Sequence, residues 1–519
     1  MKHVALVGSS GGNLYQLGGA NPAELLSQIR VQLVAAGIDL AAAVFVAADG
    51  SLDSADARRA TLWELRDGEP YRSREGALDE VNRAARELDA QIAASIEDGT
   101  TEGLILVSAD PLNVNSASAK SAAARGIPVA GSGGGCVAAA EKLGVRFVSS
   151  SGTTGSSNVT RAIAYATAFG REWGLRPAGG DATLGARARA LLVAIDPRPI
   201  LSDCLPAVVP VAVGLALVRY LPADMAEPLI EPLLMAIAVV IAAFAAAKIS
   251  KLGPAGLVGG VIAGVIASHD GLLSVLVAGL LAGALGNWVI VRTAIWGWPS
   301  TIGAMVAGGG TGVVAGLVGV VLGVVSRPLD RLILDTIDGA LLGYGIWIGL
   351  AVGLAMWPLI RRGLYHTLVI PLMVVEFEGR GLSFLATADV IALVVAAAGI
   401  AAAYALLPRA PQDRRVARHA FRVTFWFGTY VEGVYPFFES DRRVLLVAAL
   451  AGGAGTAVAG FGQGLGISYV PPWMLPLVGS SIPILAAAAL TSFGVALVGA
   501  ALLNVVHIVA ARRVAPAGR

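Results

Sequence analysis

The chain has 519 residues, of which 56% are hydrophobic and 14% charged, and its mean hydropathy is +0.72. This composition is typical of membrane proteins and excludes an ordinary soluble globular protein. The net charge of +2 gives no indication of nucleic-acid binding, and the two cysteines, Cys136 and Cys204, are too few for a disulfide framework and match no metal-binding spacing.

Charged residues are unevenly distributed along the chain. Residues 1–200 alternate charged and apolar segments, whereas long uncharged runs follow residue 205. The N-terminus has only about five apolar residues before its first glycines, which is too short for a signal peptide. We therefore expect a cytoplasmic domain over residues 1–180, a linker over 181–204, a transmembrane domain over 205–511 and a basic cytoplasmic tail over 512–519.

The first domain alternates strand-like and helical patterns. The predicted strands are His3–Val7, Leu40–Ala47, Leu104–Val107, Ile127–Ala130 and Val145–Val148, and the predicted helices are Pro22–Ala36, Gly76–Glu97, Ser116–Arg125, Cys136–Leu143 and Asn158–Trp173. Successive βα units predict an α/β domain with a doubly wound parallel sheet and helices on both faces. The pattern resembles flavodoxin-like or sugar-binding Rossmann-type domains at the level of fold, and fold alone assigns no function.

Three turns rich in glycine and serine follow strands of this sheet, at residues 8–12, 131–135 and 149–157. The carboxyl ends of parallel strands are where open α/β sheets bind ligands, and helix N-termini there favour anions. None of the turns has the spacing of a dinucleotide or phosphate loop. Each alone is equally compatible with an ordinary tight turn, but together they favour a small-ligand crevice. The predicted ligand-binding residues are Gly8, Ser9, Ser10, Gly11, Gly12, Ser132, Gly133, Gly134, Thr153 and Thr154.

Cys136 follows the second of these turns, near a predicted helix N-terminus. A thiolate would be stabilised there, as in redox or phosphorylatable cysteines. An ordinary small buried residue is the alternative, and it is the interpretation we favour.

The second half contains apolar runs long enough to cross a bilayer, which requires about 20 helical residues. Candidate spans are 205–221, 229–249, 254–269, 271–291, 301–325, 338–358, 386–407 and 444–461, with one or two more within 474–510. We therefore expect eight to ten spans. Prolines at 471, 472, 476 and 483 break the last stretch and favour a re-entrant hairpin followed by a spanning helix.

Glycines that recur four residues apart, as in Gly345, Gly349 and Gly353, indicate close helix packing rather than chemistry. The distribution of basic residues favours a cytoplasmic (inner) membrane location with both termini in the cytoplasm. Residues 414–427 are basic and then aromatic, which predicts an amphipathic helix at the membrane interface.

Glu432 is the single carboxylate in the segment Thr429–Phe438, which otherwise resembles membrane sequence. A carboxylate beside hydrocarbon costs several kcal/mol without a partner, so by default it is a functional candidate. The alternative is a solvated carboxylate in an interfacial loop. His366 is a second candidate, with a capping or interfacial role as its alternative. The acids Glu376, Glu378 and Asp389 lie between these two residues.

A histidine and a carboxylate that converge in a low-dielectric cavity could bind a polyhydroxylated ligand, with aromatic side chains against its ring. The aromatic candidates are Tyr430, Tyr435, Phe437 and Phe438. We therefore predict that Glu432, His366, Tyr430 and Tyr435 contact the substrate.

The membrane half resembles the enzyme IIC permeases of the bacterial sugar phosphotransferase system. Leu252–Gly264 and Val277–Gly283 are similar to their glycine-rich segments, Gly363–Pro371 to their Gly-Leu-His-His segment, and Gly428–Phe437 to their Gly-Ile-Thr-Glu-Pro segment. The resemblance implies a homodimeric elevator-type transporter of a small sugar-like solute in the lipid bilayer. It also implies that Glu432 and His366 contact this solute.

The chain departs from that family in its first domain. The family's phosphocarrier domain has a phosphorylated cysteine directly after its first strand, where this chain has Gly8-Ser-Ser-Gly-Gly. Phosphate transfer through this chain is therefore not expected unless a separate phosphocarrier protein supplies it. No cofactor, metal site or catalytic residue is predicted, because no nucleophile–base pair is evident.

Three functions remain open at this point. The first is a permease for a sugar or similar polar solute, regulated by its α/β domain. The second is a membrane sensor that retains the permease fold. The third is a membrane-tethered enzyme that acts on a sugar-like substrate through the first domain.

Overall fold

The computed structural model describes residues 1–11, 14–49, 59–151, 157–175, 197–250, 252–362, 364–430, 434–435, 437–438 and 441–514. The chain divides into two compact units. One unit comprises Met1–Ile195, Ala245–Ile262 and Gly279–Ala315, and the other comprises Asp196–Phe244, Ala263–Ala278 and Gly316–Arg519. Several long helices therefore contribute to both units.

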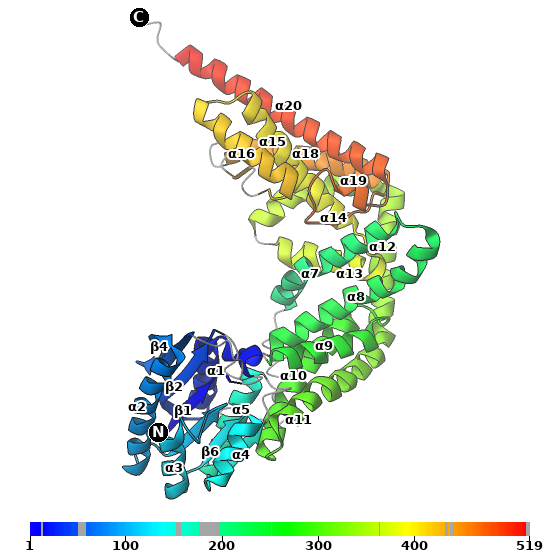
Figure 1. The fold of residues 1–519 in the computed structure, drawn as a ribbon. Coiled ribbons are helices and arrows are strands. Elements are labelled where there is room, and N and C mark those ends of the chain that lie inside the picture. The colour runs from blue at the N-terminus through cyan, green and yellow to red at the C-terminus, as the bar shows by residue number, and fades with distance from the viewer. Residues whose placement is uncertain are drawn as a thin grey trace, which may run out of the picture. The chain divides into compact units, whose positions relative to one another are not determined.

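The first unit contains an α/β domain built on one sheet (Figure 1). Its described strands are β1 (Lys2–Ser9), β2 (Ile38–Ala48), β3 (Arg59–Arg66), β4 (Glu69–Ala77), β5 (Gly103–Val107), β6 (Val129–Ser132) and β7 (Phe147–Ser151). Their order is β4-β3-β2-β1-β5-β6-β7. The strands β2, β1, β5, β6 and β7 pair in parallel, as predicted.

The prediction of a purely parallel sheet was wrong at one edge. β3 pairs antiparallel with both β2 and β4, which makes the sheet mixed. The strands β3 and β4 are joined by Asp67 and Gly68, whose φ angles of 53° and 79° form a tight turn. An Asp-Gly pair between alternating strands is a strong hairpin signal. The charged composition of β4 hid this signal, because the strand lies at the sheet edge with much of its surface exposed.

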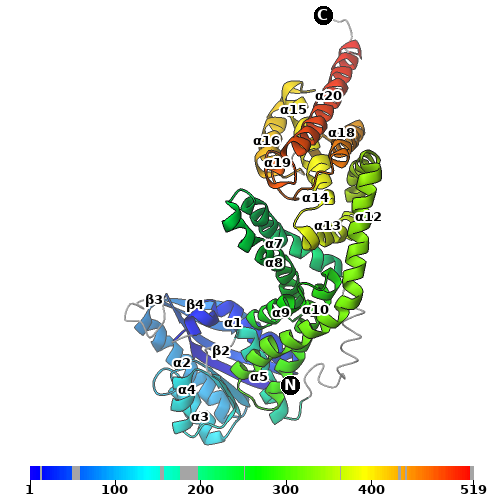
Figure 2. The same ribbon diagram turned by 90° about the vertical axis from the view of Figure 1, so that its right-hand side faces the viewer.

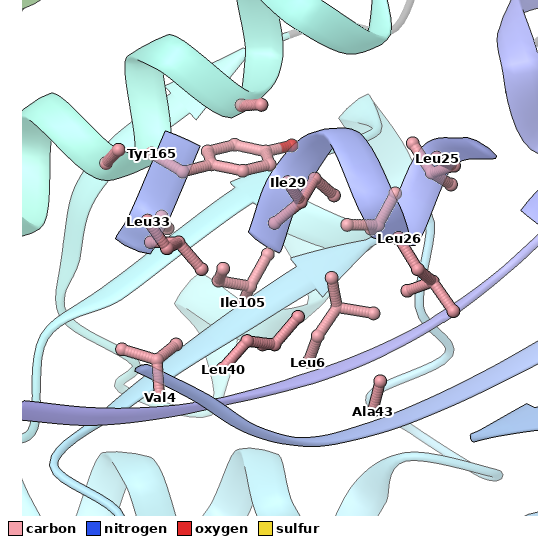
Figure 3. Packing of buried hydrophobic residues seen from close by; sticks show 14 of the residues in the cluster. Val4, Leu6, Leu25, Leu26, Ile29, Leu33, Leu40, Ala43, Ile105 and Tyr165 are labelled. Carbon is pink, nitrogen blue, oxygen red and sulfur yellow. The ribbon is translucent and has the colours of Figure 1, made fainter. Parts of the chain in front are cut away.

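Helices cover both faces of the sheet. They are α1 (Pro22–Ala35), α2 (Leu78–Glu97), α3 (Ser116–Arg125), α4 (Gly134–Lys142) and α5 (Asn158–Glu172), with a short π-helix η2 (Tyr15–Gly19) before α1. On one face, Ile29 and Leu33 of α1 and Tyr165 of α5 pack over sheet residues such as Leu6 and Ile105 (Figure 3). Residues of α2, α3 and α4 cover the other face. The predicted two-faced arrangement is confirmed.

The apolar part of the chain is helical. Its described helices are α7 (Pro197–Val218), α8 (Ala223–Ser250), α9 (Pro254–Ala267), α10 (Leu272–Ile295), α11 (Ser300–Met305), α12 (Thr311–Arg361), α13 (Tyr365–Arg380), α14 (Phe384–Asp389), α15 (Ala396–Leu406), α16 (Pro411–Phe427), α18 (Arg442–Phe461), α19 (Leu475–Val478) and α20 (Ile482–Val514). Two π-helical segments, η3 (Val306–Gly310) and η4 (Val390–Val395), interrupt them.

Within the described residues, six helical stretches are long and apolar enough to cross a membrane, and two shorter apolar helices, Cys204–Val218 and Pro254–Ala267, accompany them. The composition and these helices together indicate a membrane protein. The predicted spans 301–325 and 338–358 both lie in one helical stretch, Ser300–Arg361. Figure 2 shows α12 continuing through this region.

The polar stretch within α12 stays helical because its side chains have partners. The Asp330 carboxylate accepts a hydrogen bond of 2.7 Å from the N–H of Leu272, at the start of α10. Arg327 lies 3.4 Å from the carboxylate of Asp270. The helix is interrupted only at Tyr344, where φ is −137° and ψ is 28°.

Glycines of α12 pack directly on α18, as their spacing predicts. A Cβ atom on Gly349 would lie 2.1 Å from the carbonyl oxygen of Thr456, and one on Gly345 would lie 2.2 Å from that of Gly460. The two backbones therefore approach too closely for any side chain.

The stretch between α18 and α20 is not a continuous helix, as the prolines predict. It contains only the four-residue α19, and Gln463 and Tyr469 have φ angles of 52° and 59°. Its backbone is held by reciprocal hydrogen bonds between Ser383 and Gly466 of 2.9 and 3.1 Å. The irregular backbone at Gly466 is therefore hydrogen-bonded to another segment of the protein.

Candidate functional site

The topology of the α/β sheet defines where a ligand would bind. From β1 the chain passes through α1 to β2 on one side, whereas β5, the next parallel strand in the sequence, lies on the other side of β1. Open α/β sheets bind ligands at such a switch point, outside the carboxyl ends of the strands. A cavity of about 530 Å³ lies there, lined by residues that follow β1, β5 and β6.

The cavity collects half of the predicted ligand-binding residues. Gly8, Ser9, Gly11, Gly133 and Gly134 line it. Ser10 and Ser132 do not line it; both are buried, and the Ser10 hydroxyl accepts a hydrogen bond of 3.0 Å from the N–H of Ala48. Gly12, Thr153 and Thr154 lie outside the described residues.

Two glycines are required where the three strand ends converge. A Cβ atom on Gly8 would lie 2.3 Å from the carbonyl oxygen of Val107, the last residue of β5. Gly133 has a φ of 107°, which favours glycine, and it packs against Ser108. The glycines therefore bring the loops together, and polar side chains from other positions complete the cavity.

The polar side chains of the cavity were largely missed by sequence reasoning. Ser108, Asp110, Asn113 and Asn115 come from the loop after β5, and Asn82 comes from α2. The loop is fixed internally, because the Asn115 oxygen accepts a hydrogen bond of 3.1 Å from the N–H of Asp110. A polar run directly after the apolar strand β5 was the available signal for the loop.

Cys136 lies in the first turn of α4 and lines the same cavity. Its side chain is buried, and this burial raises the pKa of the thiol to about 11. A thiol with such a pKa is almost fully protonated at neutral pH, which argues against an activated thiolate. The geometry supports the interpretation of Cys136 as an ordinary buried residue.

The predicted substrate residues of the membrane half are only partly described. Glu432 lies outside the described residues, and His366 falls in α13 without a described side chain. Tyr430 packs edge-on against Trp357, with 5.7 Å between ring centroids. Tyr435 lies 6.0 Å from Phe438 by the same measure.

Asp389 is a buried carboxylate next to this aromatic cluster. Its oxygen accepts a hydrogen bond of 2.8 Å from the hydroxyl of Tyr365. Tyr430 and Tyr469 also lie within electrostatic range of this carboxylate. Tyr469 is held in a left-handed backbone conformation, which is costly for a residue other than glycine and is often found at functional sites. One tyrosine therefore hydrogen-bonds to this acidic group, and two others from separate segments interact with it electrostatically.

The helix that carries Asp389 is enclosed by protein and changes its geometry at that residue. Of the 18 most hydrophobic consecutive residues in the apolar stretch Phe384–Leu406, 94% are buried. The π-helix η4 begins directly after Asp389. The carbonyls of Ile391 and Ala392 accept hydrogen bonds of 2.9 Å each from Ser492 and Trp357. Such π segments occur frequently at functional sites.

Glu376 is equally buried but has a structural role. Its carboxylate accepts hydrogen bonds from the Ser383 hydroxyl and from the N–H groups of Phe384 and Leu385, at the start of α14. It also pairs with Arg380, which lies 2.7 Å from Asp338. Because these groups satisfy the carboxylate, it has little capacity left for a ligand. Asp389 is the better candidate.

Among the described residues, no three histidine, cysteine or acidic side chains are grouped so that they could hold a metal ion. A comparison with protein-family models finds no matching family, and a search of curated proteins finds no significant match. The resemblance to enzyme IIC permeases therefore stays a prediction based on short motifs.

Proposed function

We propose that the protein is an inner-membrane permease for a sugar or similar polar solute, regulated by its cytoplasmic α/β domain. The observation that supports this most is the buried Asp389 carboxylate, which has a tyrosine donor and lies beside further tyrosines in a protein-enclosed helix. A carboxylate at such a position accepts hydrogen bonds from the hydroxyl groups of a solute. Ionisable groups within apolar spans commonly mark solute pathways.

The surrounding groups suit this role. Tyr430 and Tyr469 interact electrostatically with Asp389, and a tyrosine hydroxyl can both donate and accept hydrogen bonds. Their rings, with Trp357 beside Tyr430, provide apolar surface for the face of a sugar. Glu432 follows Tyr430 by two residues, so we propose that it adds a second carboxylate to the same site. The enzyme IIC-like elevator mechanism, the homodimer and a separate phosphocarrier protein belong to this proposal.

Uptake of radiolabelled sugars into proteoliposomes tests the proposal. We expect Asp389→Asn and Glu432→Gln each to reduce uptake by about tenfold to a hundredfold, because hydrogen bonds to a charged group contribute about 1.5–3 kcal/mol. Asp335→Asn removes an exposed carboxylate of α12 and serves as the matched control, with no expected effect. Unchanged uptake by the Asp389 variant would remove this residue from the solute pathway.

The sensor function is a second candidate, and the cavity of the α/β domain favours it. The two functions differ in one measurement. A sensor binds its solute without moving it, so proteoliposomes containing the unmodified protein would show binding but no accumulation of any tested sugar.

A further inference from the structure

The charges that line the cavity at the carboxyl edge of the α/β sheet restrict the kind of ligand that it can bind. Its lining contains one charged side chain, Asp110, and no lysine, arginine or histidine among the described residues. Its volume of about 530 Å³ lies within the range of small-molecule sites. Among the described residues no cationic side chain lines the cavity, and the guanidinium of Arg86, which hydrogen-bonds to Asn113, lies outside this lining.

Helix N-termini do not compensate for this lack of cations. The first N–H groups of α3 are already occupied, because the carboxylate of Asp89 accepts hydrogen bonds from Ala117 and Ser118 at 2.9 and 3.2 Å. The N-terminus of α4 remains, and a helix terminus corresponds to about half an elementary charge. Asp110 contributes a full negative charge. The balance at the cavity disfavours an anion and favours an uncharged ligand.

The hydrogen-bonding groups of the cavity match hydroxyl groups. In the described part of the chain, the carboxamide of Asn82 and the hydroxyl of Ser108 make no hydrogen bond, and each can donate and accept. The Asn113 oxygen accepts a hydrogen bond of 3.0 Å from Arg86, which leaves its N–H groups for a ligand. Asp110 supplies an acceptor. Hydroxyl groups donate and accept, so they satisfy this mixed set better than a ligand that only accepts.

The lining also argues against a nucleotide or a flavin. It contains no aromatic side chain among the described residues, so no platform is available for stacking a planar ring. The apolar part of the lining includes the side chains of Val46, Leu78 and Val114, and aliphatic side chains can contact the face of a saturated ring.

We propose that this cavity binds an uncharged, hydroxyl-rich molecule of the size of a monosaccharide, on the cytoplasmic side. The identification of this molecule with the transported solute rests on the proposed function. The α/β domain would then respond to the cytoplasmic concentration of the solute that the membrane half admits.

Isothermal titration calorimetry on the full-length protein in detergent tests this inference. The probes are neutral hexoses, pentoses and hexitols, each compared with its phosphate ester. Titrations use the Asp389→Asn variant to weaken the proposed membrane site, and the response to a cavity substitution then shows whether the remaining binding belongs to the α/β domain. We expect a neutral probe to bind, and Asn82→Ala in the same background to weaken it about tenfold, as expected for one lost hydrogen bond. Gln91→Ala, an exposed position on the same helix, is the matched control.

The outcomes separate this inference from the proposed function. Binding that persists in Asp389→Asn and weakens with Asn82→Ala supports the inference, whether or not uptake is observed. Binding that disappears with Asp389→Asn overturns it and leaves the permease supported, and binding that persists in Asp389→Asn without weakening with Asn82→Ala overturns it as well. Binding of the phosphate esters alone, or of no probe, also overturns it.

Discussion

Two buried carboxylates perform the same local task in different halves of the molecule. Asp89 on α2 accepts hydrogen bonds from the first turn of α3, including the hydroxyl and N–H of Ser118. Glu376 on α13 accepts hydrogen bonds from the start of α14, including the hydroxyl of Ser383. Each acid therefore satisfies N–H groups that a helix start leaves without an intrahelical partner.

The two carboxylates differ in how their charge is balanced. Glu376 pairs with Arg380, whereas Asp89 has no ion pair among the described residues. Burial raises the pKa of Asp89, although its hydrogen bonds oppose this effect. The α/β domain therefore tolerates a buried charge with hydrogen bonds alone. At Glu376 the same device has a counter-ion, which offsets the cost of burying the charge, whereas Asp330, which accepts a hydrogen bond at the start of α10, has no ion pair among the described residues.

The largest effect of this difference is expected when Glu376 is replaced. Glu376→Ala removes one of the two carboxylates that pair with Arg380, leaves only Asp338, and takes away the acceptor at the start of α14. Breaking a buried ion pair in this way costs about 3–5 kcal/mol. We expect a markedly lower apparent unfolding temperature in detergent, followed by circular dichroism. Glu376→Gln keeps an acceptor for α14, so its unfolding temperature should fall between those of the unmodified protein and Glu376→Ala. Equal stability of all three proteins would show that the counter-ion has no structural role.

A comparison of Glu376 with Asp389 shows what could be predicted from the sequence. Alternating apolar patterns located the five parallel strands and the helices around them, since these depend on local periodicity. Glu376 lies close to Glu378 and four residues before Arg380, a spacing that allows an ion pair on one helix face, whereas Asp389 occurs as an isolated acid in apolar sequence. One is satisfied by a helix start, and the other is approached by tyrosines from distant segments. Only the tertiary arrangement makes Asp389 the candidate.

The α/β cavity shows a similar division between local and long-range information. Gly8 and Gly133 were found because glycine after a strand has a local conformational meaning. Asn82 could not be found, because it lies on a helix that precedes β5 and reaches the cavity only through the fold. The β3–β4 hairpin, by contrast, had a local signal in Asp67 and Gly68 that its charged flanks concealed.

A second prediction concerns the packing inside each of the two halves. The α/β domain is held by interlocking side chains, whereas α12 and α18 meet through their backbones. Gly349→Ala would place a Cβ atom 2.1 Å from the carbonyl oxygen of Thr456, which a backbone cannot easily avoid. Such overpacking costs about 1–3 kcal/mol. Gly339→Ala on the same helix meets no atom within 4 Å and is the control.

Thermal unfolding of the two glycine variants in detergent measures this contrast. We expect Gly349→Ala to lower the unfolding temperature and Gly339→Ala to leave it unchanged or raise it slightly, because alanine favours helices over glycine. If both variants behave alike, the close α12–α18 contact does not stabilise the protein.

The smallest expected effect is a change in pH dependence at Asp89. Its pKa in the folded protein is raised above the ordinary value of 3.8, so the folded state holds this proton more tightly than the unfolded state. The associated stability is complete below that value and is lost as the pH rises through the folded pKa. Asp89→Asn cannot titrate, and it should remove this part of the pH dependence while its amide oxygen still caps α3.

Hydrogen exchange of peptides from α2 and α3 in the full-length protein, corrected for intrinsic exchange rates, follows this change between about pH 4 and pH 8, a range that starts near the ordinary carboxyl pKa. Relative to the Asp89→Asn variant, protection in the unmodified protein should decline as the pH rises. A decline of equal size in both would mean that Asp89 keeps an ordinary pKa. Its hydrogen bonds with α3 would then balance the cost of burial without a counter-ion. The contrast with Glu376 would in that case reflect local hydrogen bonding rather than the surrounding medium.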